Sequence, residues 1–210
     1  MYKLLDSRYL SKEKFYDGFN NASDQHYTLL CFQLKEDSKT IFKLWGYAIN
    51  DQKKSHAEEL VIDEMEQYIA ANISHDLGKC YNITYYLSYG PCSRCCRKII
   101  DFHRLFNNVS IDIKMSKSYC FQLPEVQNGV KNLLKENISL TAMDKADFVT
   151  CFYSFVEGGH LATFEPWPDL ESHYQKFSEG LQTLQVHAIL LYAFILHFYS
   201  VLQDMIFRTI

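Results

Sequence analysis

A histidine, a glutamate and two cysteines in this chain have the types and the spacing of a hydrolytic metal site. An H-x-E motif contains His56 and Glu58, and a P-C-x-x-C motif further along contains Cys92 and Cys95. Zinc bound by three protein ligands keeps a fourth tetrahedral position for water, whereas structural zinc is bound by four Cys or His ligands. The motifs therefore predict one catalytic Zn²⁺ on His56, Cys92 and Cys95. The catalytic carboxylate of Glu58 would not bind the metal but would exchange protons with the water.

Two other interpretations use the same cysteines. A Cys-x-x-Cys pair alone could be a redox centre, but such a centre would follow a strand of a thioredoxin-like unit and would leave His56 and Glu58 without a role. Cys96 directly follows the motif, so it could replace Cys95 as a ligand, or fill the fourth position and make the zinc structural. An H-x-E followed by a P-C-x-x-C is typical of zinc deaminases that act on nucleobases, and the pair of motifs favours this interpretation.

Strand and helix patterns alternate along the chain and place both motifs at helix starts. Apolar residues recur at helical spacing after His56, and Gly90-Pro91 ends a strand directly before the cysteines. The imidazole therefore lies at one helix N-terminus and the thiols lie in the first turn of the next helix, where the helix dipoles favour thiolates. The expected strands span 27–34, 40–48, 81–88, 109–115 and 138–142. The expected helices span 15–19, 56–69, 92–106, 126–134 and 147–156.

This order of elements predicts an α/β protein. Strands that alternate with helices imply a mostly parallel sheet covered on both faces, begun by an antiparallel hairpin. The expected architecture is a three-layer α/β/α domain over residues 1–184, which would be the zinc-dependent deaminase domain. A hydrophobic C-terminal helical tail would follow over 185–210. This tail is apolar all round a helix, so we expect it to dock on the domain or to join a homo-oligomer; a membrane anchor and an incidental tail are the alternatives.

Composition favours a globular protein that is not secreted. A chain of 210 residues is long enough for one well-buried domain. Its seven cysteines are an odd number, and residues 1–6 contain no long apolar run. We therefore expect reduced thiols and a cytoplasmic and/or nuclear location.

The net charge does not resemble that of a general polyanion binder. It is −4, with a pI near 6.0, whereas nucleic-acid-binding proteins usually carry a basic surplus that neutralises phosphates. A polynucleotide would therefore have to bind a local basic patch. The alternative is that these side chains only form a solvated helix face. The candidates for such a patch are Arg94, Arg97, Lys98, Arg104, Lys114, Lys117, Lys131 and Lys135.

Further motifs give the chain a specific resemblance. It resembles the AID/APOBEC family of zinc-dependent polynucleotide cytosine deaminases from about Phe15 to Leu184. The resemblance implies a cytidine-deaminase-like fold with a five-stranded mixed sheet flanked by about six helices. It also implies hydrolytic deamination of cytosine to uracil in single-stranded DNA or RNA, in nucleic-acid editing or antiviral defence. Besides the zinc motif, the matching segments are Phe19-Asn20-Asn21, Leu30-Cys31-Phe32, Trp45-Gly46-Tyr47 and Phe164-Glu165-Pro166-Trp167.

The resemblance also implies a set of substrate-binding residues. Asn50 matches the residue that contacts the substrate sugar, and Tyr119 matches the aromatic side chain that packs against the target base. Phe121 lies in the loop that reads the 5′ neighbour. The remaining members of the implied set are His26 and Thr28 in the first substrate loop, and Ala57, Ser88, Tyr89, Gly90 and Lys117.

Two departures from the family pattern fall in this set. The chain has Ser88-Tyr89-Gly90 where the family usually has Ser-Trp-Ser, and Lys117 where it has arginine. Lysine keeps the charge but loses the bidentate fork of arginine. Two alternatives to the polynucleotide deaminase therefore stay open. One is a weak or inactive zinc-containing member that acts as a binding or regulatory protein, and the other is a deaminase of free cytidine or nucleotides.

Overall fold

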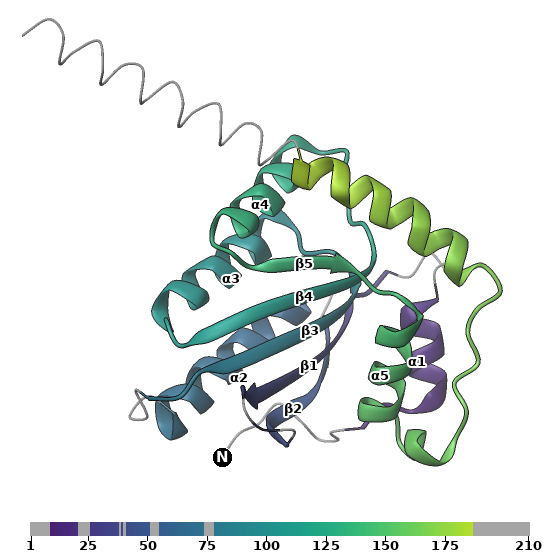
Figure 1. Ribbon diagram of the computed structural model, residues 1–210, viewed down its shortest axis with the longest axis horizontal. Coiled ribbons are helices and arrows are strands. Elements are labelled where there is room, and N and C mark those ends of the chain that lie inside the picture. Colours follow the sequence, from purple (N-terminus) through teal and green to yellow (C-terminus); the bar gives the residue numbers. More distant parts are fainter. Residues whose placement is uncertain are drawn as a thin grey trace, which may run out of the picture.

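A computed structural model describes residues 9–20, 26–37, 39, 41–50, 55–73 and 78–186 of the chain. A central sheet of five strands in the order β2-β1-β3-β4-β5 crosses the molecule (Figure 1). The strands are β1 (Leu29–Glu36), β2 (Phe42–Ile49), β3 (Tyr81–Tyr89), β4 (Val109–Lys117) and β5 (Ser139–Ala142). The helices are α1 (Lys12–Phe19), α2 (Ala57–Asn72), α3 (Ser93–Leu105), α4 (Pro124–Lys135), α5 (Lys145–Phe155) and a short 3-10 helix, η1 (Gly159–Leu161). Residues 170–186 form a further helix.

The strand directions make the sheet mixed. β1 pairs antiparallel with both β2 and β3, whereas β3, β4 and β5 pair in parallel. β2, β3, β4 and β5 therefore all run in one direction, and only β1 runs against them. The five-stranded mixed sheet is confirmed, and so is the expectation of a mostly parallel sheet that begins with an antiparallel hairpin.

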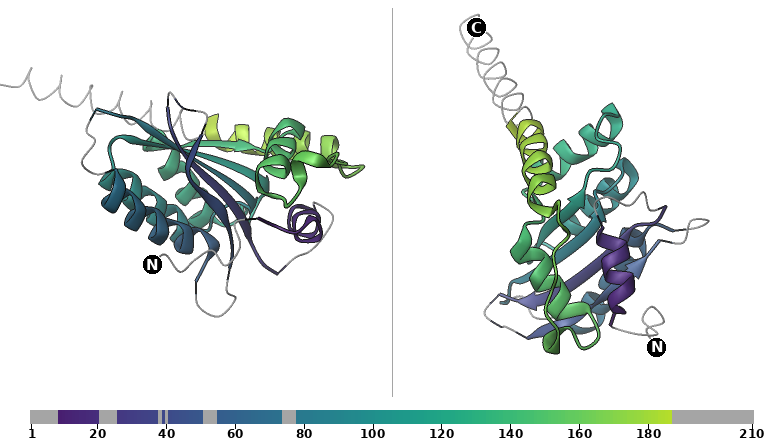
Figure 2. Two further views of the ribbon diagram at one scale, coloured as in Figure 1. Left: turned by 90° about the horizontal axis from the view of Figure 1, so that it is seen from below. Right: turned by 90° about the vertical axis from the view of Figure 1, so that its right-hand side faces the viewer.

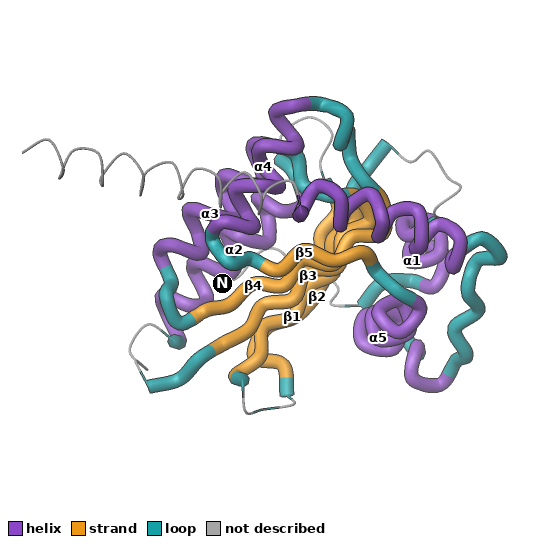
Figure 3. The backbone as a smooth tube through the Cα atoms, turned by 45° about the horizontal axis from the view of Figure 1, so that its top comes forward, coloured by secondary structure: helices purple, strands orange, loops and turns teal. Residues whose placement is uncertain are grey.

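Helices cover both faces of the sheet, as expected for three layers. Helices α2, α3 and α4 lie on one side of the sheet, and α1 and α5 lie on the other (Figure 3). Each side has its own buried cluster: the α2–α4 side is built on aliphatic side chains such as Val61, Ile99 and Leu133, and the α1/α5 side is rich in aromatic rings. Trp167, the last residue of the matching segment Phe164-Glu165-Pro166-Trp167, packs against Phe15 and Phe148 with ring centroids 6.3 and 5.5 Å apart.

The helix of residues 170–186 lies beside the β5 edge of the sheet (Figure 2). Phe177 and Leu181 of this helix join the α2–α4 cluster, and the Gln185 side chain donates to the Leu140 carbonyl oxygen at 2.8 Å. The predictions for the apolar tail fall on residues 187–210, which lie outside the described residues. Among the described residues, no helix has both the length and the apolar character needed to cross a membrane.

Candidate metal centre and pocket

The sheet brings two helix N-termini together at the C-terminal ends of two of its strands. Because β1 is antiparallel to both neighbours, β2 and β3 run in the same direction. Helix α2 follows β2 and helix α3 follows β3, so both helices begin at the edge where their strands end. His56 is the N-cap residue of α2, and its N–H donates to Glu59 Oε2 at 3.0 Å. Cys92 is the N-cap residue of α3, so it directly precedes the first turn in which both thiols were expected, whereas Cys95 lies within that turn.

The three predicted metal ligands converge at this edge. The Nδ1 atom of His56 lies 3.5 Å from Cys92 Sγ and 3.2 Å from Cys95 Sγ, and all three ligand atoms lie within 4.8 Å of one another. Zinc–nitrogen and zinc–sulfur bonds of ~2.0 and ~2.3 Å in tetrahedral geometry place such ligand atoms roughly 3.5–3.8 Å apart. The arrangement of one imidazole and two thiols therefore fits a zinc ion.

Cys96 lies outside this group of ligand atoms. Its side chain is buried in the α2–α4 cluster, where Sγ lies 3.7 Å from the carbonyl oxygen of Pro91. Gly129 of α4 lies against it, so closely that a Cβ on that glycine would be 3.0 Å from Cys96 Sγ. Within the described part of the chain, the geometry thus favours a three-ligand site, which leaves a fourth tetrahedral position for water or substrate.

Burial and hydrogen bonding set the charges around the ligands. The hydrogen bond from Cys95 lowers the pKa of Cys92 to about 5, whereas the same interaction and burial raise the pKa of Cys95. The carboxyl of Glu58 is buried, and this burial raises its pKa to about 7. The pair of cysteines is therefore poised to hold one negative charge even before a cation binds.

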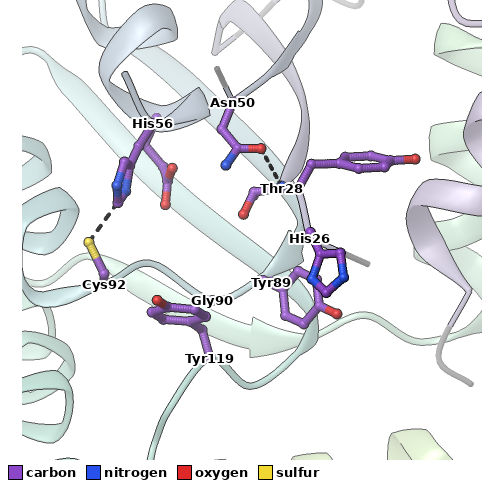
Figure 4. A pocket seen from close by; sticks show the side chains of 10 residues that line it. His26, Thr28, Asn50, His56, Tyr89, Gly90, Cys92 and Tyr119 are labelled. Atoms are coloured by element: carbon purple, nitrogen blue, oxygen red, sulfur yellow. Dashed lines mark hydrogen bonds between the residues drawn. The ribbon is translucent and has the colours of Figure 1, made fainter. Parts of the chain in front are cut away.

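A pocket with a volume of about 340 Å³ opens beside the ligands (Figure 4). It contains six of the residues that the resemblance assigned to substrate, together with Glu58 and two of the metal ligands. Tyr27 also lines the pocket and was missed, because it belongs to no sequence motif; its hydroxyl donates to Asp17 Oδ2 at 2.7 Å. The lining residues are His26, Tyr27, Thr28, Asn50, His56, Glu58, Tyr89, Gly90, Cys92 and Tyr119.

Backbone contacts hold one wall of this pocket. The Asn50 Oδ1 atom accepts the Thr28 N–H at 2.7 Å, and the Asn50 N–H donates to the Thr28 carbonyl oxygen at 3.2 Å. This pair joins the start of β1 to the end of β2. Since Oδ1 is used for the backbone contact, the amide nitrogen of Asn50 points toward the His56 side of the pocket (Figure 4). It can therefore donate to a ligand there.

Four residues of the implied substrate set do not line the pocket. Ala57 is fully buried in the α2–α4 cluster. Phe121 packs against Phe177 with ring centroids 6.0 Å apart and lies behind Gly90. Lys117 is buried and Ser88 is inaccessible to solvent. The structure thus places these four side chains around the pocket rather than in its surface.

Ser88 gives the first prediction. Its Oγ accepts the buried N–H of Leu29 at 2.9 Å, so Ser88→Ala leaves that donor unpaired. We expect a loss of about 1–3 kcal/mol in the free energy of unfolding, measured by chemical denaturation. The matched control is Ser139→Ala at an exposed strand position, which should change stability by less than ~0.5 kcal/mol. Equal stabilities of the two variants would contradict this role of the Ser88 hydroxyl.

The fold and the site together define a cytidine-deaminase-like protein. The chain belongs to the APOBEC3 family, since the model of the APOBEC3 cytosine deaminase domain matches residues 8–185.

Individual relatives agree with this membership. The chain is 28% identical to the mouse protein named DNA dC->dU-editing enzyme APOBEC-3, over 83% of this chain and 40% of the relative. It is 28% identical to the mouse C->U-editing enzyme APOBEC-2, over 76% of this chain and 70% of the relative. It is 29% identical to the human DNA dC->dU-editing enzyme APOBEC-3H, over 68% of both chains. The match thus spans about two fifths of the length of the mouse APOBEC-3 protein.

Proposed function

We propose that this protein is a zinc-dependent deaminase that converts cytosine to uracil in single-stranded polynucleotides. One observation carries the proposal: His56, Cys92 and Cys95 converge at the same pocket that holds the Glu58 side chain. A redox pair would need only the two thiols. The imidazole and the buried carboxylate have a role only if the site activates water.

Zinc bound by His56, Cys92 and Cys95 would lower the pKa of a water molecule toward neutrality. Glu58 lies in the same pocket and acts as the general base and acid. It takes a proton from the water that attacks carbon 4 of cytosine and delivers this proton to ring nitrogen 3. It then takes the second proton of the former water from the oxygen on carbon 4 and delivers it to the amino group, so that the carbon–nitrogen bond breaks, ammonia leaves and uracil remains.

The pocket walls orient the base and its sugar. Tyr119 is 44% exposed at the pocket, so its ring is available to stack on a base. The Asn50 amide nitrogen and the Thr28 hydroxyl supply polar contacts on the opposite wall (Figure 4). These contacts suit one nucleotide extruded from a strand.

A polynucleotide is favoured over a free nucleoside as the substrate. The pocket opens to solvent beside the exposed ring of Tyr119, so neighbouring nucleotides of a strand can lie outside it. The mouse APOBEC-3 and human APOBEC-3H relatives are named as enzymes that edit dC to dU in DNA.

The substrate class is tested with purified, zinc-loaded protein and three substrates. These are a single-stranded DNA oligonucleotide with one dC, its RNA counterpart, and free cytidine. We expect uracil in at least one oligonucleotide and at least about 100-fold slower turnover of cytidine, since remote binding energy is lost when the strand is removed. The oligonucleotide annealed to its complement is the control and should be protected.

Two results would contradict the proposal. Turnover of cytidine as fast as of the oligonucleotides would indicate a nucleoside deaminase. A folded, zinc-loaded protein that forms no uracil in any of the three substrates would indicate a binding or regulatory protein.

A further inference from the structure

Lys117 is a buried cation that lies next to the pocket without lining it. It is the last residue of β4 and is paired in parallel register with Tyr89 at the end of β3. Only 7% of its surface is exposed. Burial of an ammonium group is costly unless the charge has partners, so the contacts of this side chain indicate what it does.

Two contacts with described residues help to hold the ammonium group in place. Its Nζ lies 4.2 Å from the centroid of the Tyr89 ring, well within the distance of a cation–π interaction. The same nitrogen donates to the carbonyl oxygen of Asn20 at 2.9 Å, just after the end of α1.

The backbone of Lys117 holds the next residue of the pocket. Its carbonyl oxygen accepts the N–H of Gly90 at 2.8 Å. Lys117 therefore contacts both residues at which this chain departs from the Ser-Trp-Ser pattern. Tyr89 and Gly90 both line the pocket, so a change at Lys117 reaches the pocket through them.

We propose that Lys117 is a positioning residue whose ammonium group holds the Tyr89 ring as a wall of the pocket. This inference rests on the proposed deaminase function. It replaces the phosphate contact that was expected of Lys117 as a member of a basic patch, because its ammonium group is directed at a ring face and a backbone carbonyl. Tyr89 is smaller than the family tryptophan, so its ring needs a neighbour that fixes its orientation.

The two roles predict different effects on the salt dependence of binding. A contact between a lysine and one phosphate adds about 0.7 to the slope of log affinity against log salt for a single strand. A lysine that only positions Tyr89 leaves this slope unchanged. Loss of the positioning contact instead misplaces the base, which can cost about 10–100-fold in the rate of the chemical step.

The experiment compares Lys117→Met, Lys117→Gln and Lys117→Arg with wild type. We expect the Met variant to lower kcat on the single-stranded oligonucleotide by about 10–100-fold, with an unchanged salt slope of the oligonucleotide Kd. The Arg variant should recover most of this loss because guanidinium also lies well on an aromatic face. The Gln variant can still donate a hydrogen bond to the Asn20 carbonyl, so it carries the test if the Met variant does not fold. Lys145→Met, which removes an exposed lysine of α5, is the control for loss of charge.

A double-mutant cycle with Tyr89→Leu completes the test. If Lys117 acts through the ring, its substitution should have little further effect on kcat in the Tyr89→Leu background. Independent, multiplying effects would overturn the inference. So would a salt slope that becomes shallower by about 0.7 in the Met or Gln variant while kcat is kept. A wild-type protein that binds the oligonucleotide but does not deaminate it would contradict the proposed function, and the salt slopes of binding would still decide between the two roles of Lys117.

Discussion

Replacing Glu58 with glutamine is expected to abolish uracil formation while the protein keeps its zinc. Glutamine has nearly the same shape but cannot take a proton from water, and general acid–base catalysis typically contributes about 10²–10⁴-fold to a rate. We therefore expect kcat on the single-stranded oligonucleotide to fall by about 10³-fold or more. Glu58 is not one of the three converging ligands, so the zinc content should stay at its wild-type value.

Glu64→Gln is the matched control for this experiment. Glu64 is a second buried glutamate of α2 and does not belong to the lining of the pocket. Its substitution makes the same chemical change on the same helix, so it should leave kcat within a few fold of wild type. Undiminished uracil formation by the Glu58 variant would show that Glu58 is not the general base and acid of the reaction.

Cys95→Ala is expected to lose both zinc and activity, whereas Cys96→Ala should keep both. The two cysteines are neighbours on α3, yet only the Sγ of Cys95 lies beside His56. Removal of one of three ligands should reduce the metal content of the purified protein to a small fraction of one ion per chain. The Cys96 variant leaves a small cavity beside Gly129 and should lose only about 1 kcal/mol of stability.

The measurement is the zinc-to-protein ratio after dialysis against a weak chelator, followed by the deamination assay. Readdition of zinc should restore activity to the wild-type and Cys96→Ala proteins but not to Cys95→Ala. The opposite pattern, with zinc lost from the Cys96 variant, would make Cys96 the ligand and contradict the observed geometry.

The elements that carry the chemistry could be predicted from sequence because their signals are local. The spacing of Cys92 and Cys95 places both thiols on one turn of a helix, and His56 precedes a run of apolar residues at helical spacing. The sheet was less predictable. Whether β1 pairs with β2 alone or also with β3 depends on contacts between distant segments, and no local pattern in residues 27–36 encodes that choice.

The substrate-binding side chains, too, could be predicted only in part. Thr28, Asn50 and Tyr119 lie in the pocket, at strand ends or in the loop that follows β4. Lys117 and Phe121 come from the same region of the chain, but packing directs them elsewhere. The direction of a side chain near a strand end depends on its tertiary neighbours, which a motif does not contain.

Strand β1 lies between β2 and β3, the strands that lead into the two helices with the predicted zinc ligands. This placement bears on whether the protein folds before or after it binds metal. The strands that precede α2 and α3 are held by their pairing with β1, and both helices pack in the α2–α4 cluster; His56, Cys92 and Cys95 belong to neither the paired strands nor this cluster. The polypeptide is thus expected to fold first and to take up its metal afterwards, in contrast to zinc fingers, which gain their fold only with the ion. Zinc would then bind and dissociate reversibly where β2 and β3 end, and the protein would not have to unfold and refold.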